Sequence, residues 1–172
     1  MDQYIKLAKN AIETYVKDKK VLKEPRYLPA EMAESKAGVF VSLHQKDNKL
    51  RGCIGTFYPT CKNIAAEIIQ NAISACSQDP RFLPVKPGGL KDLEINVDVL
   101  SNSEQTTLAQ LNPQKYGTIV KSSSGKIGLL LPDIEGVSSA QQQIEICKEK
   151  AGIDKDEKIE IFRFTVERHK EK

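Results

Sequence analysis

The sequence predicts an α+β fold in a single compact domain, in which antiparallel strands are interrupted by helices. Two β-hairpins and two central amphipathic helices follow from the hydrophobic pattern. No strand–helix unit carries a glycine-rich phosphate loop, so a doubly wound nucleotide-binding fold is not expected. The length of 172 residues is that of one average domain, and no long linker divides it.

The N-terminal third contains a helix and a hairpin. Residues 3–20 repeat apolar side chains at three- and four-residue spacing, which predicts an amphipathic helix, and two prolines in 23–29 prevent its continuation. Residues 39–44 and 50–54 alternate as strands do and flank a polar turn at 46–49. We therefore expect a β-hairpin over these residues.

The centre of the chain predicts a second helix and a strand. Thr60 is the expected N-cap of a helix that runs to about Ser77. A proline-rich loop at 79–89 follows, and residues 93–99 form the clearest half-buried strand. The buried stripe of the helix is expected to contain Ile64, Ile68, Ile69, Ala72, Ile73 and Cys76.

A second hairpin and a capped helix come next. Residues 116–121 and 126–131 flank a serine- and glycine-rich turn. Ser139 followed by Gln142 predicts a capping box, and Gly152 suits a left-handed C-terminal cap.

The last strand, 158–166, changes phase. Ile159 and Ile161 share one face, whereas Phe162 and Phe164 share the other. Either a β-bulge near Ile161 and Phe162 restores the phase or both faces are covered.

Composition excludes several classes of protein. A formal net charge of +3 is too small to indicate a nucleic-acid or anionic-lipid partner, so nucleic acid is not expected. No apolar run is long enough for a membrane helix, and the N-terminus does not resemble a signal peptide. We expect a cytoplasmic protein with reduced thiols.

The scarce residue types also argue against a metal site. The two histidines, His44 and His169, lie far apart in the sequence, and the four cysteines include no CxxC pair. No metal is expected, and no cofactor is indicated.

The hexapeptide Leu50–Gly55 is the most unusual segment. Strand alternation places Arg51 and Cys53 on one face. A two-residue turn at 47–48 would set Ser42 opposite Cys53 and His44 opposite Arg51, whereas a four-residue loop would keep the faces and shift the pairs.

This face has a chemical interpretation and a structural one. A guanidinium roughly 7 Å along the strand from a thiol favours the thiolate, and His44 supplies a proton carrier, so Cys53 and His44 are the catalytic candidates. Arg51, Gly52 and Gly55 are ligand-binding candidates, because the glycines allow close backbone approach. In the structural interpretation, Cys53 is a small buried hydrophobe and Arg51 an ion-pair partner.

Arg81 is a further ligand-binding candidate. It lies in Asp79-Pro80-Arg81-Phe82, a proline-stiffened loop that would hold an anion-binding guanidinium in place. The alternative is a structural Asp79–Arg81 turn fastened by Phe82 in the core.

The other cysteines are expected to be structural. Cys76 and Cys147 lie on apolar helix stripes. Cys61 stands at the expected start of a helix, where the dipole would lower its pKa, although a packing role is favoured.

Six short motifs together resemble the AMMECR family, whose prokaryotic members are called AmmeMemoRadiSam system protein A. They occur in the family's order and spacing over residues 5–168: LRGCIG at 50–55, DPRF at 79–82, YG at 116–117, GLLLP at 128–132, GV at 136–137 and KAGI at 150–153.

The resemblance implies one domain over 5–168 with flexible termini at 1–4 and 169–172. It implies two β-β-β-α-β-like repeats whose terminal strands are exchanged, with the N-terminal helix packed outside them. It also implies a Memo-like protein and a radical S-adenosylmethionine protein as partners. It transfers no reaction, cofactor or oligomeric state.

Two functions remain open from the sequence. The first is an enzyme, or enzyme subunit, that acts on a small anionic metabolite through the LRGCIG hairpin. The second is a non-catalytic protein-interaction module that docks on the two partners.

Overall fold

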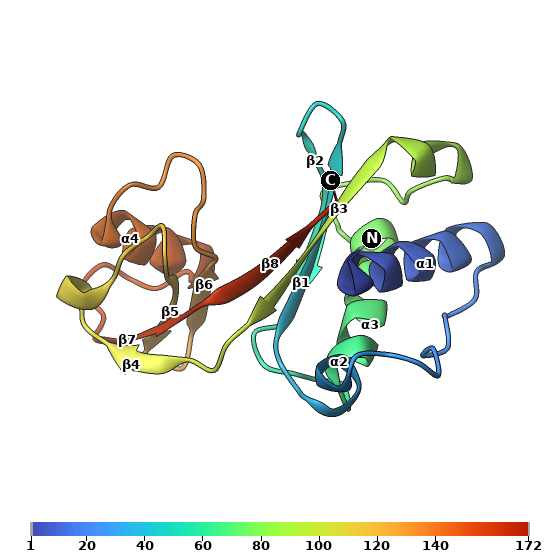
Figure 1. Ribbon diagram of the computed structural model, residues 1–172. Helices are drawn as coiled ribbons and strands as arrows, with labels where there is room; N and C mark the ends of the chain where they lie inside the picture. Colours follow the sequence, from blue (N-terminus) through green and yellow to red (C-terminus); the bar gives the residue numbers. More distant parts are fainter. Residues whose placement is uncertain (1, 172) are drawn as a thin grey trace. The chain divides into compact units, whose positions relative to one another are not determined.

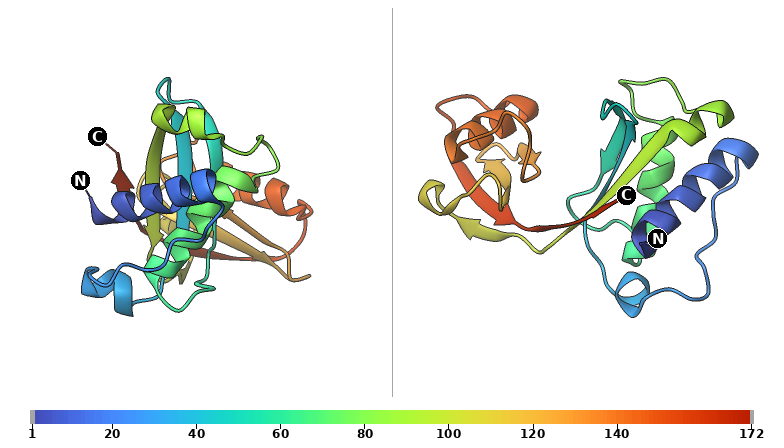
Figure 2. Two further views of the ribbon diagram at one scale, coloured as in Figure 1. Left: turned by 90° about the vertical axis from the view of Figure 1, so that its right-hand side faces the viewer. Right: turned by 45° about the horizontal axis from the view of Figure 1, so that its top comes forward.

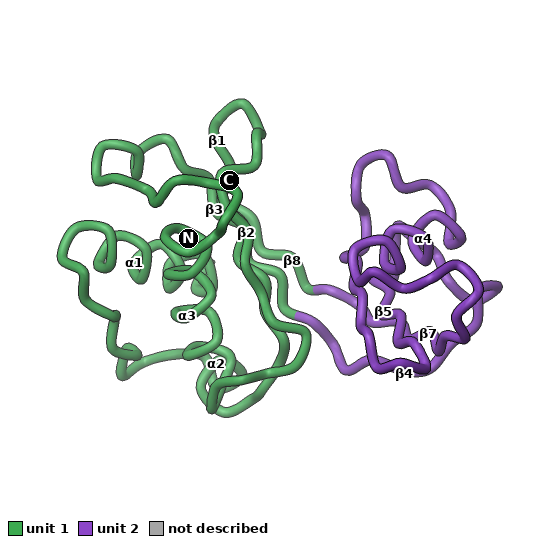
Figure 3. The backbone as a smooth tube through the Cα atoms, turned by 180° about the vertical axis from the view of Figure 1, so that it is seen from behind, with its two compact units in different colours: residues 1–99, 167–172 green, residues 100–166 purple. Residues whose placement is uncertain are grey.

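The structure, a computed structural model, describes residues 2–171, and the chain divides into two compact units. Unit 1 comprises residues 1–99 and 167–172, and unit 2 comprises residues 100–166 (Figure 3). The antiparallel α+β fold with an N-terminal helix is confirmed. Within residues 2–171, no helix is long and apolar enough to cross a membrane.

Unit 1 is a four-stranded sheet with two helices on one face (Figures 1 and 2). The strands stand in the order β2-β1-β3-β8, and α1 and α3 share one apolar core with β1 and β3. Its elements are α1 (Gln3–Asp18), α2 (Ala30–Glu34), β1 (Val39–Gln45), β2 (Leu50–Gly55), α3 (Ile64–Ser77), η1 (Pro87–Asp92), β3 (Leu93–Leu100) and β8 (Val166–Lys170).

The two ends of the described chain belong to the fold of unit 1. The Asp2 carboxylate caps α1 by accepting from the N–H groups of Tyr4 and Ile5. His169 in β8 stacks on Tyr4 with ring centroids 3.9 Å apart, and Glu171 pairs with Lys9. Asp2, Tyr4, His169 and Glu171 therefore make contacts within unit 1, and residues 1 and 172 lie outside the described part. The flexibility of 1–4 and 169–172 stays a prediction.

Helix α3 begins later than predicted. Asn63, not Thr60, is the N-cap, and its side chain accepts from the N–H of Ala66. Thr60 instead donates its hydroxyl to Glu67, 2.9 Å away, so its oxygen is engaged by a carboxylate rather than by a helix terminus. The predicted apolar stripe is confirmed, since all six of its members are buried.

Unit 2 is a second four-stranded sheet with one helix, in the strand order β4-β7-β5-β6. Ser139 caps its helix, and Gly152 ends it with a φ of 62°, so both predicted caps are confirmed. The elements are β4 (Glu104–Thr106), η2 (Leu108–Gln110), β5 (Gly117–Ser122), β6 (Ile127–Leu130), α4 (Ala140–Ala151) and β7 (Ile159–Phe164).

The predicted last strand, 158–166, is wrong in its end, because β7 stops at Phe164 and Val166 begins β8 of the other sheet. Its phase change has no bulge. Strand β7 pairs with β5 in unbroken register from Ile159 to Phe164. Ile159 and Ile161 pack on the core beneath α4, while Phe164 on the other face is also buried. The second of the two alternatives is therefore the correct one.

The two units repeat one topology, as the family resemblance implies. Unit 2 runs β4-β5-β6-α4-β7, and unit 1 runs β1-β2-α3-β3 with β8 added from the C-terminus, so that β4 and β8 are exchanged between the sheets. A glycine repeats at the same place: Gly52 in β2 faces the Ala75 carbonyl of α3, and Gly128 in β6 faces the Cys147 carbonyl of α4. Each helix thus approaches a strand where a Cβ would not fit.

Candidate functional site

The hairpin of β1 and β2 has most of the predicted register. Ser42 stands opposite Cys53 and Val41 opposite Ile54, as predicted. His44, however, pairs with Leu50 rather than with Arg51, because the register shifts between Leu43 and His44. Leu43, the residue before His44, pairs with Gly52. Arg51 lies between Leu50 and Gly52 and has no partner on β1, so it is the extra residue of a β-bulge.

The turn explains this shift. The N–H of Gln45 donates to the Lys49 carbonyl at 2.8 Å, and the N–H of Asn48 donates to the Gln45 carbonyl at 2.8 Å. Asn48 has a φ of 63°, which makes this a three-residue loop closed by a left-handed residue. The extra loop residue and the bulge compensate, so the pairs beyond Arg51 return to the predicted register.

Asp79 clamps the backbone of this hairpin. One carboxylate oxygen accepts from the Cys53 N–H at 2.9 Å, and the two oxygens accept from Nε and Nη2 of Arg81 at 3.0 and 2.8 Å. Arg81 Nη2 also donates to the Cys53 carbonyl at 3.3 Å. The Arg81 hydrogen bonds hold the pKa of Asp79 far below its usual range although the carboxylate is almost fully buried.

Phe82 is half-buried and lies near two guanidinium groups instead of in the core. The guanidinium carbons of Arg51 and Arg81 lie 5.9 and 5.4 Å from its ring centroid. Arg51 Nη2 also donates to the Leu83 carbonyl at 2.7 Å. Phe82 is half-buried and the Leu83 side chain is 82% exposed, so the predicted core anchor at Phe82 is wrong. The turn between Asp79 and Arg81, in contrast, is present.

The two predicted anion-binding arginines differ in charge balance. Arg81 is neutralised by Asp79 through a two-pronged salt bridge. Arg51 makes no ion pair with any residue in the range 2–171; it contacts the Leu83 carbonyl and the Phe82 ring. The positive charge available on this surface is therefore that of Arg51.

Cys53, Ser42 and His44 lie near one another. Cys53 is half-buried and faces Ser42 across the hairpin. His44 Nε2 lies 3.2 Å from the Ser42 hydroxyl, and Nδ1 lies 3.4 Å from the Asn48 carbonyl. The structure thus brings His44 to Ser42.

The two glycines of the motif have a packing role. A Cβ at Gly52 would overlap the Ala75 carbonyl of α3, and a Cβ at Gly55 would overlap the Phe40 ring. The close approach expected at these glycines is therefore made by the protein itself, on the side where a side chain would stand.

A buried polar network on α3 lies next to the β1–β2 hairpin. Glu67 of α3 is fully buried and accepts four hydrogen bonds, from Thr56 Oγ1 at 2.6 Å, Thr60 Oγ1 at 2.9 Å, and the N–H groups of Thr60 and Cys61 at 2.9 and 2.7 Å. Burial raises the pKa of Glu67, but these bonds outweigh it and the net shift is downward. Asn71 of α3 adds a bond to the Val39 carbonyl.

Sequence reasoning missed Glu67 and Asn71, because it assigned α3 an apolar stripe only. The signal was present in the spacing, since Glu67 and Asn71 stand four residues apart and so share the face of Ile64 and Ile68.

The remaining cysteines are structural in character. Cys76 and Cys147 are buried, which raises their pKa values to about 11 and about 12. Burial also raises the pKa of Cys61, which precedes α3 and lies beside Glu67, so the lowered pKa considered for it is wrong.

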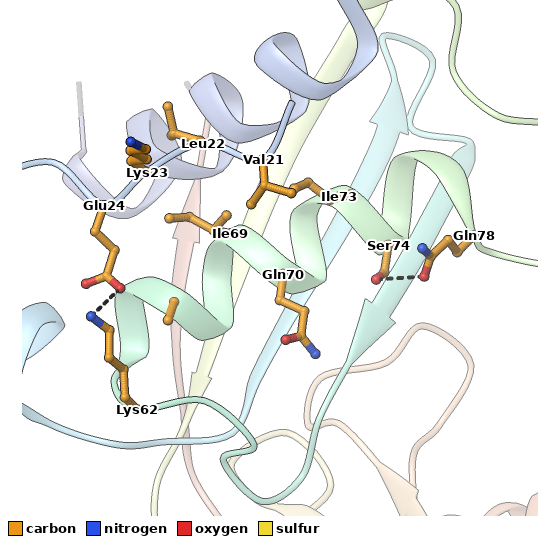
Figure 4. A pocket seen from close by; sticks show the side chains of 11 residues that line it. Val21, Leu22, Lys23, Glu24, Lys62, Ile69, Gln70, Ile73, Ser74 and Gln78 are labelled. Atoms are coloured by element: carbon orange, nitrogen blue, oxygen red, sulfur yellow. Dashed lines mark hydrogen bonds and ion pairs between the residues drawn. The ribbon is translucent and has the colours of Figure 1, made fainter. Parts of the chain in front are cut away.

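No group of three metal-ligating side chains occurs in the described range 2–171. A groove of about 700 Å³ lies elsewhere in unit 1, between residues 21–24 and α3 (Figure 4). Its polar rim is paired internally, through Lys62 with Glu24 at 2.9 Å and Ser74 with Gln78 at 3.1 Å.

Comparison with known proteins identifies the family. The AMMECR1 family model matches residues 5–169. The chain belongs to this family. A protein of Thermotoga maritima is 50% identical over 169 residues, which are 97% of both chains. Protein CA_C1420 of Clostridium acetobutylicum is 48% identical over 171 residues, which are 99% of this chain and 36% of that protein.

The fold of this AMMECR1-family protein is also known from a crystal structure. The uncharacterised protein PH0010 from Pyrococcus horikoshii matches with a TM-score of 0.88 and 30% sequence identity. The match covers 98% of this chain and 90% of the other. The family and fold predictions are therefore confirmed.

Proposed function

We propose that this AMMECR1-family protein is a protein-interaction module that uses the Arg51–Phe82–Leu83 surface. The observation that carries the proposal is Leu83, a large apolar side chain left 82% exposed. Its carbonyl accepts from Arg51, and it follows Phe82, whose ring lies near both arginines. Arginine and aromatic side chains are the residue types that contribute most to binding energy at protein interfaces. Single exposed apolar residues are ordinary on protein surfaces, but Leu83 lies next to Arg51 and Phe82.

The surface is held in place before any partner arrives. Arg51 fixes the Leu83 carbonyl, and Asp79 fixes both Arg81 and the backbone of Cys53. Little side-chain entropy is then lost on binding, which favours affinity. In the described part of the chain, no acidic side chain neutralises Arg51. We therefore expect the partner protein to place an acidic side chain against Arg51 and an apolar pocket against Leu83.

The relative from Clostridium acetobutylicum supports a module that acts alongside other protein. There, the region similar to this chain makes up 36% of a longer polypeptide. The proposed partners are a Memo-like protein and a radical S-adenosylmethionine protein, as the family resemblance implies.

The test mixes the full chain with each of these two proteins from the same genome and measures the dissociation constant by calorimetry. Leu83→Asp and Arg51→Glu should each weaken binding at least tenfold. Tyr27→Asp, at a side chain 93% exposed outside this surface, serves as the matched control and should leave it unchanged. Absence of binding to both proteins, or equal loss in the control, would contradict the proposal.

A second candidate function is thiol chemistry on a small anionic metabolite. The position of Ser42 favours this function. Ser42 pairs with Cys53 across the hairpin, and its hydroxyl lies 3.2 Å from Nε2 of His44, which can carry a proton. Arg51 would hold the anion. The test measures the rate of Cys53 alkylation by iodoacetamide as a function of pH, in the wild type and in His44→Ala. Identical curves that give a thiol pKa near the value of a free cysteine, about 8.5, would exclude this role.

A further inference from the structure

The two repeats are covered unequally on the face that carries their helices. In unit 1, α3 contacts β1 and β2, and α1 lies beside α3 on the same face (Figures 1 and 2). Helix α1 contacts β8 through the Tyr4–His169 stack, and Lys9 of α1 pairs with Glu171, the residue after β8. Helix α1 thus covers the β3 and β8 half of the sheet.

Unit 2 has no helix in the corresponding place. Helix α4 contacts β5 and β6, as α3 contacts β1 and β2. Ile159 and Ile161 of β7 pack at the edge of the core beneath α4, and residues 100–166 supply no second α-helix over β7 and β4. The exposure of the strands shows the difference: Ile95 and Val97 of β3 are buried, whereas Ile159 and Ile161 of β7 are only half-buried.

A groove of about 770 Å³ lies between α4 and β7, and Leu108 of η2 also lines it. All of its lining residues belong to unit 2. Five of them are apolar and come from α4, β7 and the segments beside them: Leu108, Ile144, Ile153, Ile159 and Ile161. The α4 side extends from Gln141 to Glu149, a rise of about 12 Å, which is the length of roughly two helical turns.

The charges at the rim indicate what kind of occupant fits. Glu145 and Glu149 stand one turn apart on α4, and within residues 2–171 neither carboxylate takes part in an ion pair. The ammonium of Lys148 between them donates to the Lys155 carbonyl at 2.6 Å and so is already engaged. A basic side chain entering over α4 would therefore meet two carboxylates that have no ion-pair partner among residues 2–171.

We propose that this groove binds an amphipathic helix of a partner protein, in the place that α1 occupies in unit 1. About two turns of the helix would lay an apolar stripe against Ile144, Ile159 and Ile161, and a lysine or arginine would reach Glu145 and Glu149. Recognition of a helix by an apolar groove is a common mode of binding. The proposal does not depend on the Arg51–Leu83 surface, since its residues lie in the other unit.

The experiment uses two labelled peptides and the full chain. One peptide has the sequence of residues 2–19, and the other is an 18-residue model helix of leucine, alanine and lysine with the same apolar spacing; a scrambled version of each is the negative control. Fluorescence anisotropy should show saturable binding of at least one ordered peptide. Leu108→Lys should weaken it at least tenfold, and Ile127→Lys should change it less than twofold.

Leu108 and Ile127 form a matched pair, because they are 44% and 41% exposed in the same unit and only Leu108 lines the groove. If Leu108→Lys fails to fold by circular dichroism, Glu149→Lys replaces it, with Glu135→Lys as its control. Failure of both ordered peptides to bind the wild type overturns the proposal, as does an equal effect in each matched pair. A wild type that is dimeric in gel filtration and becomes monomeric with Leu108→Lys also overturns it, because a second copy would then fill the groove.

Discussion

Replacement of Glu67 by glutamine tests the network that supports the hairpin. Each of its four hydrogen bonds is now charge-assisted, and the amide would retain the same shape while the threonine hydroxyls turn to accept. A bond to a charged group stabilises by about 1 kcal/mol more than a neutral one, which amounts to about 4 kcal/mol over four bonds. Removing a buried charge offsets part of this loss, so we expect the free energy of unfolding to fall by about 2 kcal/mol at pH 7.

The pH dependence gives the same reasoning a second test. The folded-state pKa of Glu67 is lowered from its ordinary value of 4.5, so its contribution is complete above that value and is lost as pH falls through the folded pKa. The stability gap between the wild type and Glu67→Gln should therefore be widest at pH 7 and narrow below about pH 4.

Urea unfolding at pH 7 and at a series of lower pH values measures both effects. Glu13→Gln, which removes an exposed ion pair with Lys17, is the control and should change stability by less than about 0.5 kcal/mol. A Glu67→Gln protein as stable as the wild type at pH 7, or a gap that stays constant with pH, would refute the reasoning.

Three further predictions concern the hairpin and the core. Gly52→Ala should lower the free energy of unfolding by at least about 2 kcal/mol in urea titration, because the new Cβ meets a helix carbonyl, whereas Gly88→Ala, with open space around it, should not destabilise; equal effects would contradict this. Asp79→Asn should speed hydrogen exchange of the Cys53 amide at least tenfold, since the charged acceptor and its salt bridge are lost; unchanged exchange would count against the clamp. Cys76, buried and with its pKa raised to about 11, should resist iodoacetamide at pH 8 in the folded protein and react in urea; rapid native labelling would disprove its burial.

The secondary structure was largely predictable, because each element depends on local periodicity and on its own caps. The apolar stripe of α3 and the caps Ser139 and Gly152 are where the sequence places them. The start of α3 was not predictable from Thr60. The Thr60 hydroxyl donates to the buried carboxylate of Glu67 and does not cap the helix. The choice between these two roles depends on burial, which the local pattern does not contain.

The candidate site was predictable only in part. The hairpin register predicted from the sequence correctly placed Ser42 opposite Cys53. His44 pairs with Leu50 instead of the predicted Arg51, because Arg51 forms a bulge. A structural turn of Asp79 and Arg81 was expected as an alternative from the sequence, whereas the salt bridge that neutralises Arg81 and the position of Phe82 near two guanidinium groups were not.

The sequence by itself determined the main helices and hairpins, the apolar stripe of α3 and, through its motifs, the membership of the AMMECR1 family. Only the tertiary structure decided which strands are exchanged between the two sheets, namely β4 and β8, that Asp79 clamps Cys53, and that one sheet carries two helices while the other carries one. The physical reason is the range of the interactions. Periodicity and caps act within a few residues, but Asp79 and Cys53 are 26 residues apart, and the helix that covers a sheet is chosen by which apolar surfaces meet in three dimensions.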